Sequence, residues 1–211
     1  MSKVKICGLS RPDDIAAVNR ALPDFIGFVF ASSRRRVDIK TAARLKEKLD
    51  PRIEAVGVFV NEDIEAVIQI YKNGVIDLAQ LHGEESGAYV RRLKESCGCR
   101  VIKAIGIGNT LPALPVEPDY LLFDTLSGQR GGIGTAFDWN HLKGYRGLPY
   151  FLAGGLTAEN VSYALSSLSP YCIDVSSAVE TGGVKDERKI NDFVCSVRKN
   201  SVLFKTSCGT Y

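Results

Sequence analysis

Eight short runs of apolar and β-branched residues recur along the chain, and longer amphipathic segments separate most of them. The runs are expected to be strands: Val4–Cys7, Phe25–Phe30, Ala55–Val60, Leu78–Leu81, Val101–Ile105, Tyr120–Asp124, Tyr150–Ala153 and Ile173–Ser176. Runs that are apolar on both faces suit a parallel sheet covered on both sides. Helices are predicted over Pro12–Leu22, Thr41–Leu49, Ile64–Asn73, Ala88–Ser96, Ala158–Leu168 and Lys189–Lys199. Weaker and shorter helical patterns occur near Leu111 and over Trp139–Lys143.

Strand and helix patterns alternate without a linker-like change of composition over 211 residues. This alternation predicts an α/β fold, a single (β/α)8 TIM barrel, rather than two domains. The competing open, doubly wound sheet normally has a glycine-rich turn after its first strand, and Cys7-Gly8-Leu9-Ser10-Arg11 does not supply one. We expect the barrel to span residues 1–198, with a C-terminal extension at 199–211 that is a candidate for disorder.

Composition and charge exclude several classes of partner. Hydrophobic residues make up 45% and charged residues 24%, as in ordinary globular domains, and the net charge of +3 is too small to indicate nucleic acid. No apolar run approaches the roughly 18 residues of a membrane span, and no secretory signal is visible. Six scattered cysteines and two histidines lack metal-ligand spacing. We therefore expect a cytoplasmic protein without a metal, a membrane contact or a nucleic-acid partner.

In a barrel of this kind, reactive residues lie at the carboxyl ends of the strands. Cys7 ends the first predicted strand and Asp124 ends the sixth, on opposite sides of an eight-stranded ring. A thiolate and a carboxylic acid form a workable base–acid pair if their surroundings shift both pKa values towards neutrality. Further polar residues at strand ends are Gln80, His82, Asp174 and Ser176.

Two further patterns suggest binding of an anionic small molecule. Gly154-Gly155, followed by a predicted helix, is typical of a phosphate site after the seventh strand of a barrel. The trio Arg34-Arg35-Arg36 could hold an acidic group through the guanidinium fork. Each feature also has a structural interpretation: a core cysteine, a capping aspartate, a solvated arginine face or a simple glycine turn. Their joint placement at one end of the predicted barrel favours a site.

With these residues identified, the chain resembles the phosphoribosylanthranilate isomerase family from Lys3 to about Val197. The resemblance rests on motifs in the family's order: Lys5-Ile6-Cys7-Gly8-Leu9, Gly27–Phe30 with Ser33–Val37, Val56–Asn61, Gln80–Glu85, Leu122-Phe123-Asp124, Gly131–Trp139, Ala153–Val161 and Ile173–Glu180. Leu9 and Ser10 stand where the family usually has isoleucine and threonine, and the loop that contains Arg35 lacks a common insert. Neither departure removes a position that carries chemistry in the family.

The resemblance implies an isomerase that performs an Amadori rearrangement in tryptophan biosynthesis, without a cofactor. N-(5-phosphoribosyl)anthranilate would become 1-(2-carboxyphenylamino)-1-deoxyribulose 5-phosphate. Asp124 matches the family's general acid, Cys7 matches its general base, and Arg35 matches the arginine that holds the anthranilate carboxylate.

The resemblance also implies further binding residues. Gln80, His82 and Asp174 match positions that line the substrate pocket. The phosphate would lie against Gly132, Gly134, Gly154, Gly155, Ser176 and Ser177.

Three other functions stay open from the sequence alone. Two are enzymes, a sugar-phosphate epimerase and a neighbouring synthase of the tryptophan pathway, and the third is a non-catalytic phosphosugar-binding barrel. A metal-dependent epimerase would need a cluster of ligands at the strand ends, where only His82 is available. The presence of both Cys7 and Asp124 argues against a non-catalytic barrel. The partner is expected to be a phosphorylated small molecule, and we favour a monomer over a dimer.

Overall fold

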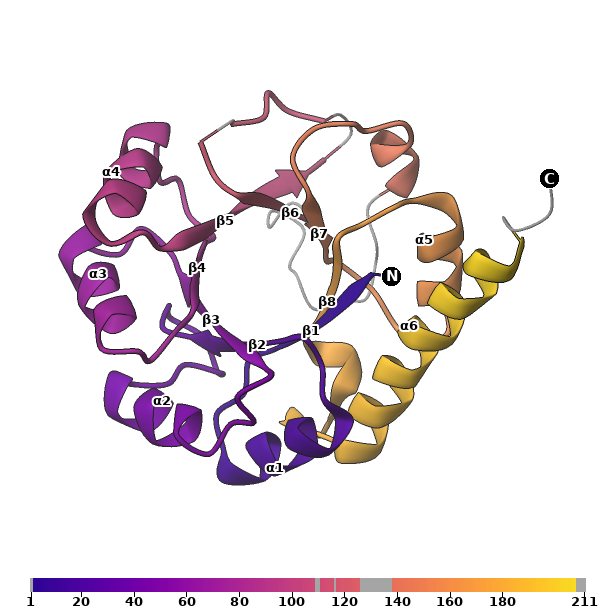
Figure 1. Ribbon diagram of the computed structural model, residues 1–211, viewed down its shortest axis with the longest axis horizontal. Coiled ribbons are helices and arrows are strands. Elements are labelled where there is room, and N and C mark those ends of the chain that lie inside the picture. The colour runs from indigo at the N-terminus through magenta and orange to yellow at the C-terminus, as the bar shows by residue number, and fades with distance from the viewer. Residues whose placement is uncertain (1, 109–110, 116, 126–137, 208–211) are drawn as a thin grey trace.

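Eight parallel strands form a closed barrel, which confirms the predicted fold class. The computed structural model describes residues 2–108, 111–115, 117–125 and 138–207, the last eight of these by their backbone alone. The strands pair in chain order and β1 closes the ring by pairing with β8 (Figure 1). They are β1 Lys3–Cys7, β2 Phe25–Val29, β3 Glu54–Phe59, β4 Leu78–Leu81, β5 Arg100–Ile107, β6 Tyr120–Thr125, β7 Tyr150–Leu152 and β8 Cys172–Val175.

Helices surround the barrel on its outside (Figure 1). They are α1 Pro12–Ala21, α2 Ile39–Lys46, α3 Ile64–Lys72, α4 Gly87–Cys97, α5 Val161–Ser167 and α6 Glu187–Ser207. Their starts follow local capping rules, because Asp38, Asp63 and Ser86 each accept backbone N–H groups of the first turn of α2, α3 and α4. None of the described helices combines the length and apolarity that crossing a membrane requires.

Alternation along the strands decides which side chains enter the barrel. In each strand, residues two apart share a face. The register pairs Lys5 with Phe25 and with Asp174, and pairs Gln80 with Ile102. One cluster of buried apolar residues lies in the interior: Phe25, Val56, Leu78, Ile102, Ala104, Leu122, Phe151, Ala153 and Cys172. Polar residues lie at the carboxyl ends of strands, among them Cys7 at the end of β1 and Asp124 near the end of β6.

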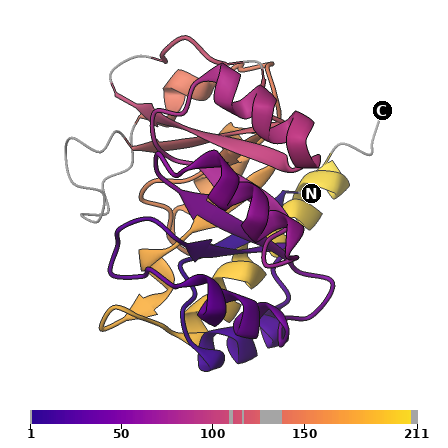
Figure 2. The ribbon, with the colours of Figure 1, turned by 90° about the vertical axis from the view of Figure 1, so that its left-hand side faces the viewer.

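Two segments differ from the sequence-based expectations. Residues 111–115 form no helix, in keeping with Pro112 and Pro115, which lack backbone donors. By contrast, the short helical pattern over Trp139–Lys143 corresponds to a 3₁₀ helix, Trp139–Leu142, in the described part of the β6–β7 connection. After β8, a second 3₁₀ helix, Ser177–Val179, leads into an unpredicted hairpin of β9 (Glu180–Thr181) and β10 (Val184–Lys185). The hairpin projects beyond the strands at one end of the barrel (Figure 2).

The last helix continues past position 198, where the sequence analysis places the end of the barrel domain. Helix α6 runs to Ser207 and packs against α1 and α5. The division into a barrel and a C-terminal extension stays a prediction.

An aromatic cluster at the base of the interior generates a stability prediction. The ring centroid of Phe151 lies 5.5 Å from that of Phe25 and 5.6 Å from that of Tyr120. Phe151→Ala should lower the free energy of unfolding by about 3–5 kcal/mol, because it removes a fully buried ring and leaves a cavity. Urea denaturation measures the loss. Tyr163→Ala, which truncates a side chain that is 59% exposed, is the control and should change stability by only about 0.5 kcal/mol. Equal losses in the two variants would contradict this account of the core.

Candidate active site

The polar residues of the barrel mouth come from four strands and the loops that follow them. Cys7 ends β1, Gln80 lies in β4 with His82 directly after it, Asp124 lies near the end of β6, and Asp174 lies in β8. The structure brings these five predicted residues to one end of the barrel. Gly132 and Gly134 lie outside the described residues.

A buried lysine that the sequence analysis did not select connects several of these residues. Lys5 has no solvent exposure, and its Nζ donates hydrogen bonds to Asp174 Oδ2 at 2.8 Å and to Gln80 Oε1 at 2.9 Å. The Cys7 thiol also interacts electrostatically with Lys5. Burial opposes the charge of Lys5, but Asp174 and Cys7 outweigh that effect, so the pKa of Lys5 lies above its ordinary value. The sequence contains one indication of this role. Lys5 lies two residues before Cys7 in the same strand, so both side chains lie on the inner face.

Cys7 occupies a tight pocket at the end of β1. A Cβ atom at Gly27 would lie only 2.7 Å from Cys7 Sγ, so the neighbouring strand needs a glycine there. The Ser176 hydroxyl donates to the Cys7 carbonyl oxygen at 3.0 Å. Burial raises the pKa of the Cys7 thiol, and the charges of Lys5 and Lys185 oppose that rise without cancelling it. The pKa of Cys7 is therefore not shifted towards neutrality in the way that a base paired with Asp124 would require.

Asp124 lies beside a neutral histidine and a glycine turn. Its Oδ1 accepts the Thr125 backbone N–H at 2.7 Å, and its Oδ2 lies 3.8 Å from His82 Nε2. Burial raises the pKa of Asp124 above that of an ordinary aspartate, which favours the protonated form. Gly154 has φ +78°, and a Cβ there would lie 2.9 Å from Asp124 Oδ1, so this position needs glycine for both conformation and space.

The loop that carries His82 is fixed by a buried ion pair from the next strand. Lys103 Nζ lies 3.0 Å from Glu85 Oε2 and also donates to the carbonyl oxygen of Gly83. Glu85 in turn accepts the backbone N–H groups of Asn61 and Gly83. These contacts satisfy backbone groups that a sharp turn leaves free, and they hold the residues after β4 in one position.

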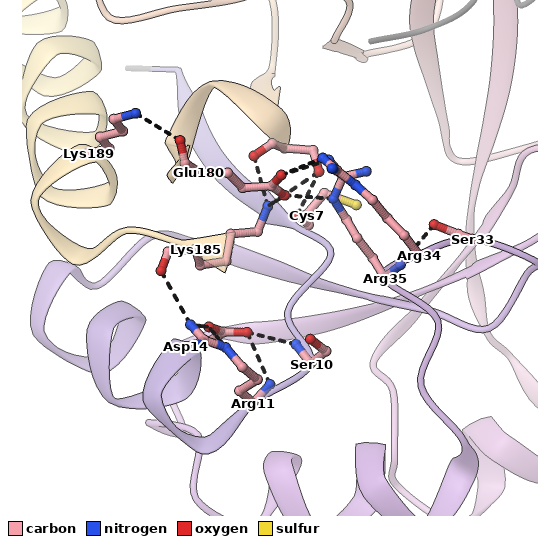
Figure 3. Close-up of polar contacts among 11 residues, drawn as sticks. Cys7, Ser10, Arg11, Asp14, Ser33, Arg34, Arg35, Glu180, Lys185 and Lys189 are labelled. Carbon is pink, nitrogen blue, oxygen red and sulfur yellow. Dashed lines mark hydrogen bonds and ion pairs between the residues drawn. The ribbon is translucent and has the colours of Figure 1, made fainter. Parts of the chain in front are cut away.

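Two arginines and a lysine converge on Glu180, whose side chain is only 4% exposed (Figure 3). Arg35 donates to both carboxylate oxygens, from Nε at 2.6 Å and from Nη2 at 3.0 Å, and Arg34 Nη2 donates at 2.7 Å. Lys185 Nζ donates to Glu180 at 2.7 Å and to the Ser176 carbonyl oxygen at 2.8 Å. Burial raises the pKa of Glu180, but the hydrogen bonds from Arg35 and Lys185 outweigh it, so the pKa lies below the ordinary value.

The predicted arginine thus reaches the barrel mouth, but a carboxylate of the protein already holds one edge of its guanidinium group. The aliphatic part of Arg35 lies over Gly8, where a Cβ would come within 2.4 Å of Arg35 Cδ. Arg35 is therefore directly beside the residue that follows Cys7. Sequence analysis missed Glu180 and Lys185, because the hairpin that presents them was not predicted.

The predicted phosphate-binding residues follow β7 and β8, two neighbouring strands of the barrel. Gly154 and Gly155 both have positive φ, +78° and +67°, so the backbone turns sharply here. Ser176 directly follows β8 and Ser177 begins the 3₁₀ helix. The Ser176 hydroxyl is engaged by the Cys7 carbonyl oxygen, which leaves backbone groups as the available donors at this position.

The arrangement can perform acid–base chemistry on an anionic small molecule. A thiol and a carboxyl group with a raised pKa face the mouth from β1 and β6, with arginine and lysine side chains nearby. Within the described residues, no group of three or more histidine, cysteine, aspartate or glutamate side chains is placed to hold a metal ion. Fold and site together define an acid–base enzyme on a TIM barrel.

Comparison with known proteins supplies the family. The model of the N-(5′-phosphoribosyl)anthranilate (PRA) isomerase family matches residues 4–196, and the chain belongs to this family. A relative from Endomicrobium trichonymphae, named N-(5′-phosphoribosyl)anthranilate isomerase, is 46% identical over 199 residues, which cover 94% of this chain and 99% of the relative. This chain is accordingly an isomerase.

Solved structures show the same similarity. A phosphoribosyl anthranilate isomerase in complex with reduced 1-(o-carboxyphenylamino)-1-deoxyribulose 5-phosphate superimposes with a TM-score of 0.81 at 32% identity, over 94% of this chain and 100% of that one. A structure of monomers generated from the dimeric enzyme of Thermotoga maritima superimposes with a TM-score of 0.78 at 32% identity, over 94% of this chain and 99% of that one.

The Glu180 cluster generates a prediction about stability and pH. Glu180→Gln should destabilise the protein by roughly 3 kcal/mol at neutral pH, because it leaves buried Lys185 without its counter-charge. The pKa of Glu180 is lowered by folding, so its contribution is complete above the ordinary glutamate value of 4.5 and is lost as the pH falls through the lower folded value. The urea midpoints of wild type and variant should therefore converge in acid.

The matched control for this prediction is Glu187→Gln. Glu187 pairs with Arg20 on the surface, where both side chains are about half exposed, so the same substitution should change the midpoint little at any pH. A constant gap between wild type and Glu180→Gln down to pH 2 would contradict the proposed charge effect.

Proposed function

We propose that this chain converts N-(5-phosphoribosyl)anthranilate into 1-(2-carboxyphenylamino)-1-deoxyribulose 5-phosphate by an Amadori rearrangement, with Asp124 as general acid and Cys7 as general base. The observation that carries the assignment is the placement of both groups on inner faces at the barrel mouth, together with the raised pKa of Asp124. Family membership favours this isomerisation, a step of tryptophan biosynthesis, over the epimerase, synthase and non-catalytic alternatives.

The first step is protonation by Asp124. Because burial keeps a proton on this carboxyl group, it can donate that proton to the ring oxygen of the ribose. The bond between the ring oxygen and C1′ then breaks with its electron pair on oxygen, and the nitrogen lone pair forms a C1′=N double bond. The product of this step is an open-chain iminium cation, and Asp124 is left as a carboxylate.

The second step is removal of the C2′ proton by Cys7. The C–H electron pair forms a C1′=C2′ double bond and the C=N electrons return to nitrogen, so the enolamine is neutral. It then tautomerises to the ketone product. The free thiol has a raised pKa, but the iminium cation would add a positive charge beside Lys5 and Lys185 and favour the thiolate. The thiol would release its proton to solvent at this stage, since Cys7 is only partly buried, and the thiolate then accepts the C2′ proton. The base would thus become competent only after the acid has acted.

Several groups of the mouth are suited to hold the substrate. Glu180 takes the Nε–Nη2 edge of Arg35, so the anthranilate carboxylate would approach from the Nη1 side. Asp174 Oδ1 is buried and has no hydrogen-bond partner among the described residues, so it is available to accept a sugar hydroxyl. The phosphate would be bound by backbone N–H groups of Gly154, Gly155, Ser176 and Ser177, with Gly132 and Gly134 from the loop after β6.

Our proposal includes a cytoplasmic location. It is supported by the thiols, because the five cysteines in the described part of the chain are free, as expected in a reducing compartment. The oligomeric state stays a prediction. A monomer is favoured from the sequence, and a relative from Thermotoga maritima is described as dimeric.

The assigned roles predict the effect of two substitutions. Cys7→Ala and Asp124→Asn should each lower kcat by about 10²–10⁴-fold, the usual contribution of a positioned acid or base, and leave the protein folded. Loss of anthranilate fluorescence during turnover of phosphoribosylanthranilate measures the rate, with a chelator present. Cys195→Ala and Asp192→Asn, which alter exposed positions on α6, are the controls. A near-normal kcat in either test variant would remove that residue from the mechanism.

The substrate-dependent activation of Cys7 has its own test. An ordinary cysteine thiol has a pKa of about 8.5. Because burial disfavours the Cys7 thiolate, the rate of Cys7 alkylation by iodoacetamide in the free enzyme should still be rising above that pH. Mass spectrometry of the peptide that contains Cys7 follows this thiol separately from the exposed Cys195. A rate that levels off below pH 7 would show that the free enzyme already holds a thiolate.

A further inference from the structure

A chain of polar contacts crosses the barrel interior from β1 to β6. Lys5 Nζ lies 2.9 Å from Gln80 Oε1, Gln80 Nε2 lies 2.9 Å from His82 Nδ1, and His82 Nε2 lies 3.8 Å from Asp124 Oδ2. At the other end of the series, Lys5 interacts electrostatically with the Cys7 thiol, which lies two residues further along β1. The proposed base and the proposed acid are therefore the two ends of one series of interactions.

The chemistry of these groups gives the series a single direction. An ammonium group only donates hydrogen bonds, so the Gln80 atom that faces Lys5 must be its oxygen. The amide nitrogen then faces His82, and because it can only donate, His82 Nδ1 must accept and cannot carry a hydrogen. The imidazole is consequently neutral, and its one hydrogen is on Nε2, which faces Asp124.

The surrounding charges support a neutral imidazole. His82 lies at the rim of the mouth with 37% of its side chain exposed, and the partial burial of its ring disfavours the imidazolium cation. The Lys5 and Lys103 ammonium groups also repel a positive charge on the ring. Asp174 and Glu85 act in the opposite sense, and Asp124 faces the ring from β6. The net result is a pKa of His82 below its ordinary value.

We infer that Lys5 and Gln80 are positioning residues that lock His82 in its Nε2–H tautomer, so that the imidazole cannot take the proton of Asp124. This inference rests on the proposed role of Asp124 as general acid. With hydrogen on Nε2 and with Nδ1 engaged by Gln80, neither ring nitrogen can accept that proton. Once Asp124 has protonated the substrate, the same Nε2–H can donate to the new carboxylate and stabilise it.

The other neutral tautomer of His82, with its hydrogen on Nδ1, would disable the proposed general acid. An imidazole with a bare Nε2 facing Asp124 would be a stronger base than the ring oxygen of the substrate. The proton would pass from Asp124 to His82, giving an imidazolium–carboxylate pair with no acid directed at the substrate. A residue that keeps His82 in one protonation pattern therefore protects the first chemical step without touching the substrate.

Gln80→Glu is the decisive variant, because it preserves size and the contact with Lys5 but replaces the donor that faces His82 with an acceptor. The carboxylate should draw a hydrogen onto Nδ1. Nitrogen-15 NMR of the histidine side chains reads the protonation pattern directly, and the chain has only two histidines. A spectrum of His82→Asn contains His141 alone and completes the assignment. We expect hydrogen on Nε2 in the wild type and on Nδ1 in Gln80→Glu.

Kinetics supply the second measurement. Gln80→Glu should lower kcat by about 10²-fold, because the acid is lost, and should change KM by less than about threefold. Gln69→Glu, the same substitution at an exposed position of α3, should change neither kcat nor KM.

Lys5→Met tests the other positioning residue and should give a mixture of both His82 tautomers, since the amide of Gln80 can then rotate. If this variant does not fold, Gln80→Glu still decides the question.

The outcomes separate this inference from the proposed function. Hydrogen on Nδ1 in the wild type, or an unchanged tautomer in Gln80→Glu, would overturn the lock whatever the activity. An altered tautomer with an unchanged kcat would also overturn it, since the protection would then have no effect. Absence of turnover in the wild type would instead count against the proposed function, while the NMR result would still report on the tautomer.

Discussion

The charge of Lys5 is the interaction on which the interior of this barrel depends. An ammonium group without any solvent exposure is tolerated only because Asp174, Gln80 and Cys7 surround it. That single requirement fixes side chains from β1, β4 and β8 relative to one another. It also places a positive charge below the mouth, where anionic forms of Cys7 and Asp124 are needed at different stages of the reaction. Stability and chemistry are thus governed by the same buried cation.

A second charged centre has a similar arrangement with the signs of the charges reversed. Glu180 is a nearly buried anion that three cationic side chains surround, Arg34, Arg35 and Lys185 (Figure 3). Because Lys185 also binds the residue after β8, this centre connects the hairpin to the pocket of Cys7. The charges of Lys5 in the first centre and of Lys185 in the second both act on the Cys7 thiol. The arginine that we assign to the substrate carboxylate is therefore already oriented before any substrate binds.

The sequence was informative about the fold and about residues at strand ends, for a physical reason. Strand periodicity and the rule that places function at carboxyl ends depend on local pattern, so Cys7, Gln80, Asp124 and Asp174 could be selected and the barrel could be predicted. Glu180 and Lys185 could not, because they lie in a hairpin whose strands are only two residues long. Lys5 was not selected, because its role comes from pairing across the ring and is only hinted at by its spacing from Cys7. The weak pattern near Leu111 was overridden by prolines. Charge balance in a closed barrel is a property of tertiary structure, and no single segment displays it.

The closure of the ring by β1 and β8 has a consequence for the order in which the site is made. Cys7 lies in the first strand of the barrel, so it leaves the ribosome well before Asp174, Ser176 and Lys185, which lie in β8 or after it. The thiol therefore lacks its pocket while the first seven strands are made, and the pocket can form only when almost the whole barrel is available. The reactive end of this enzyme is completed only with β8 and the hairpin that follows it, so a barrel terminated before them has a cysteine but no site for it.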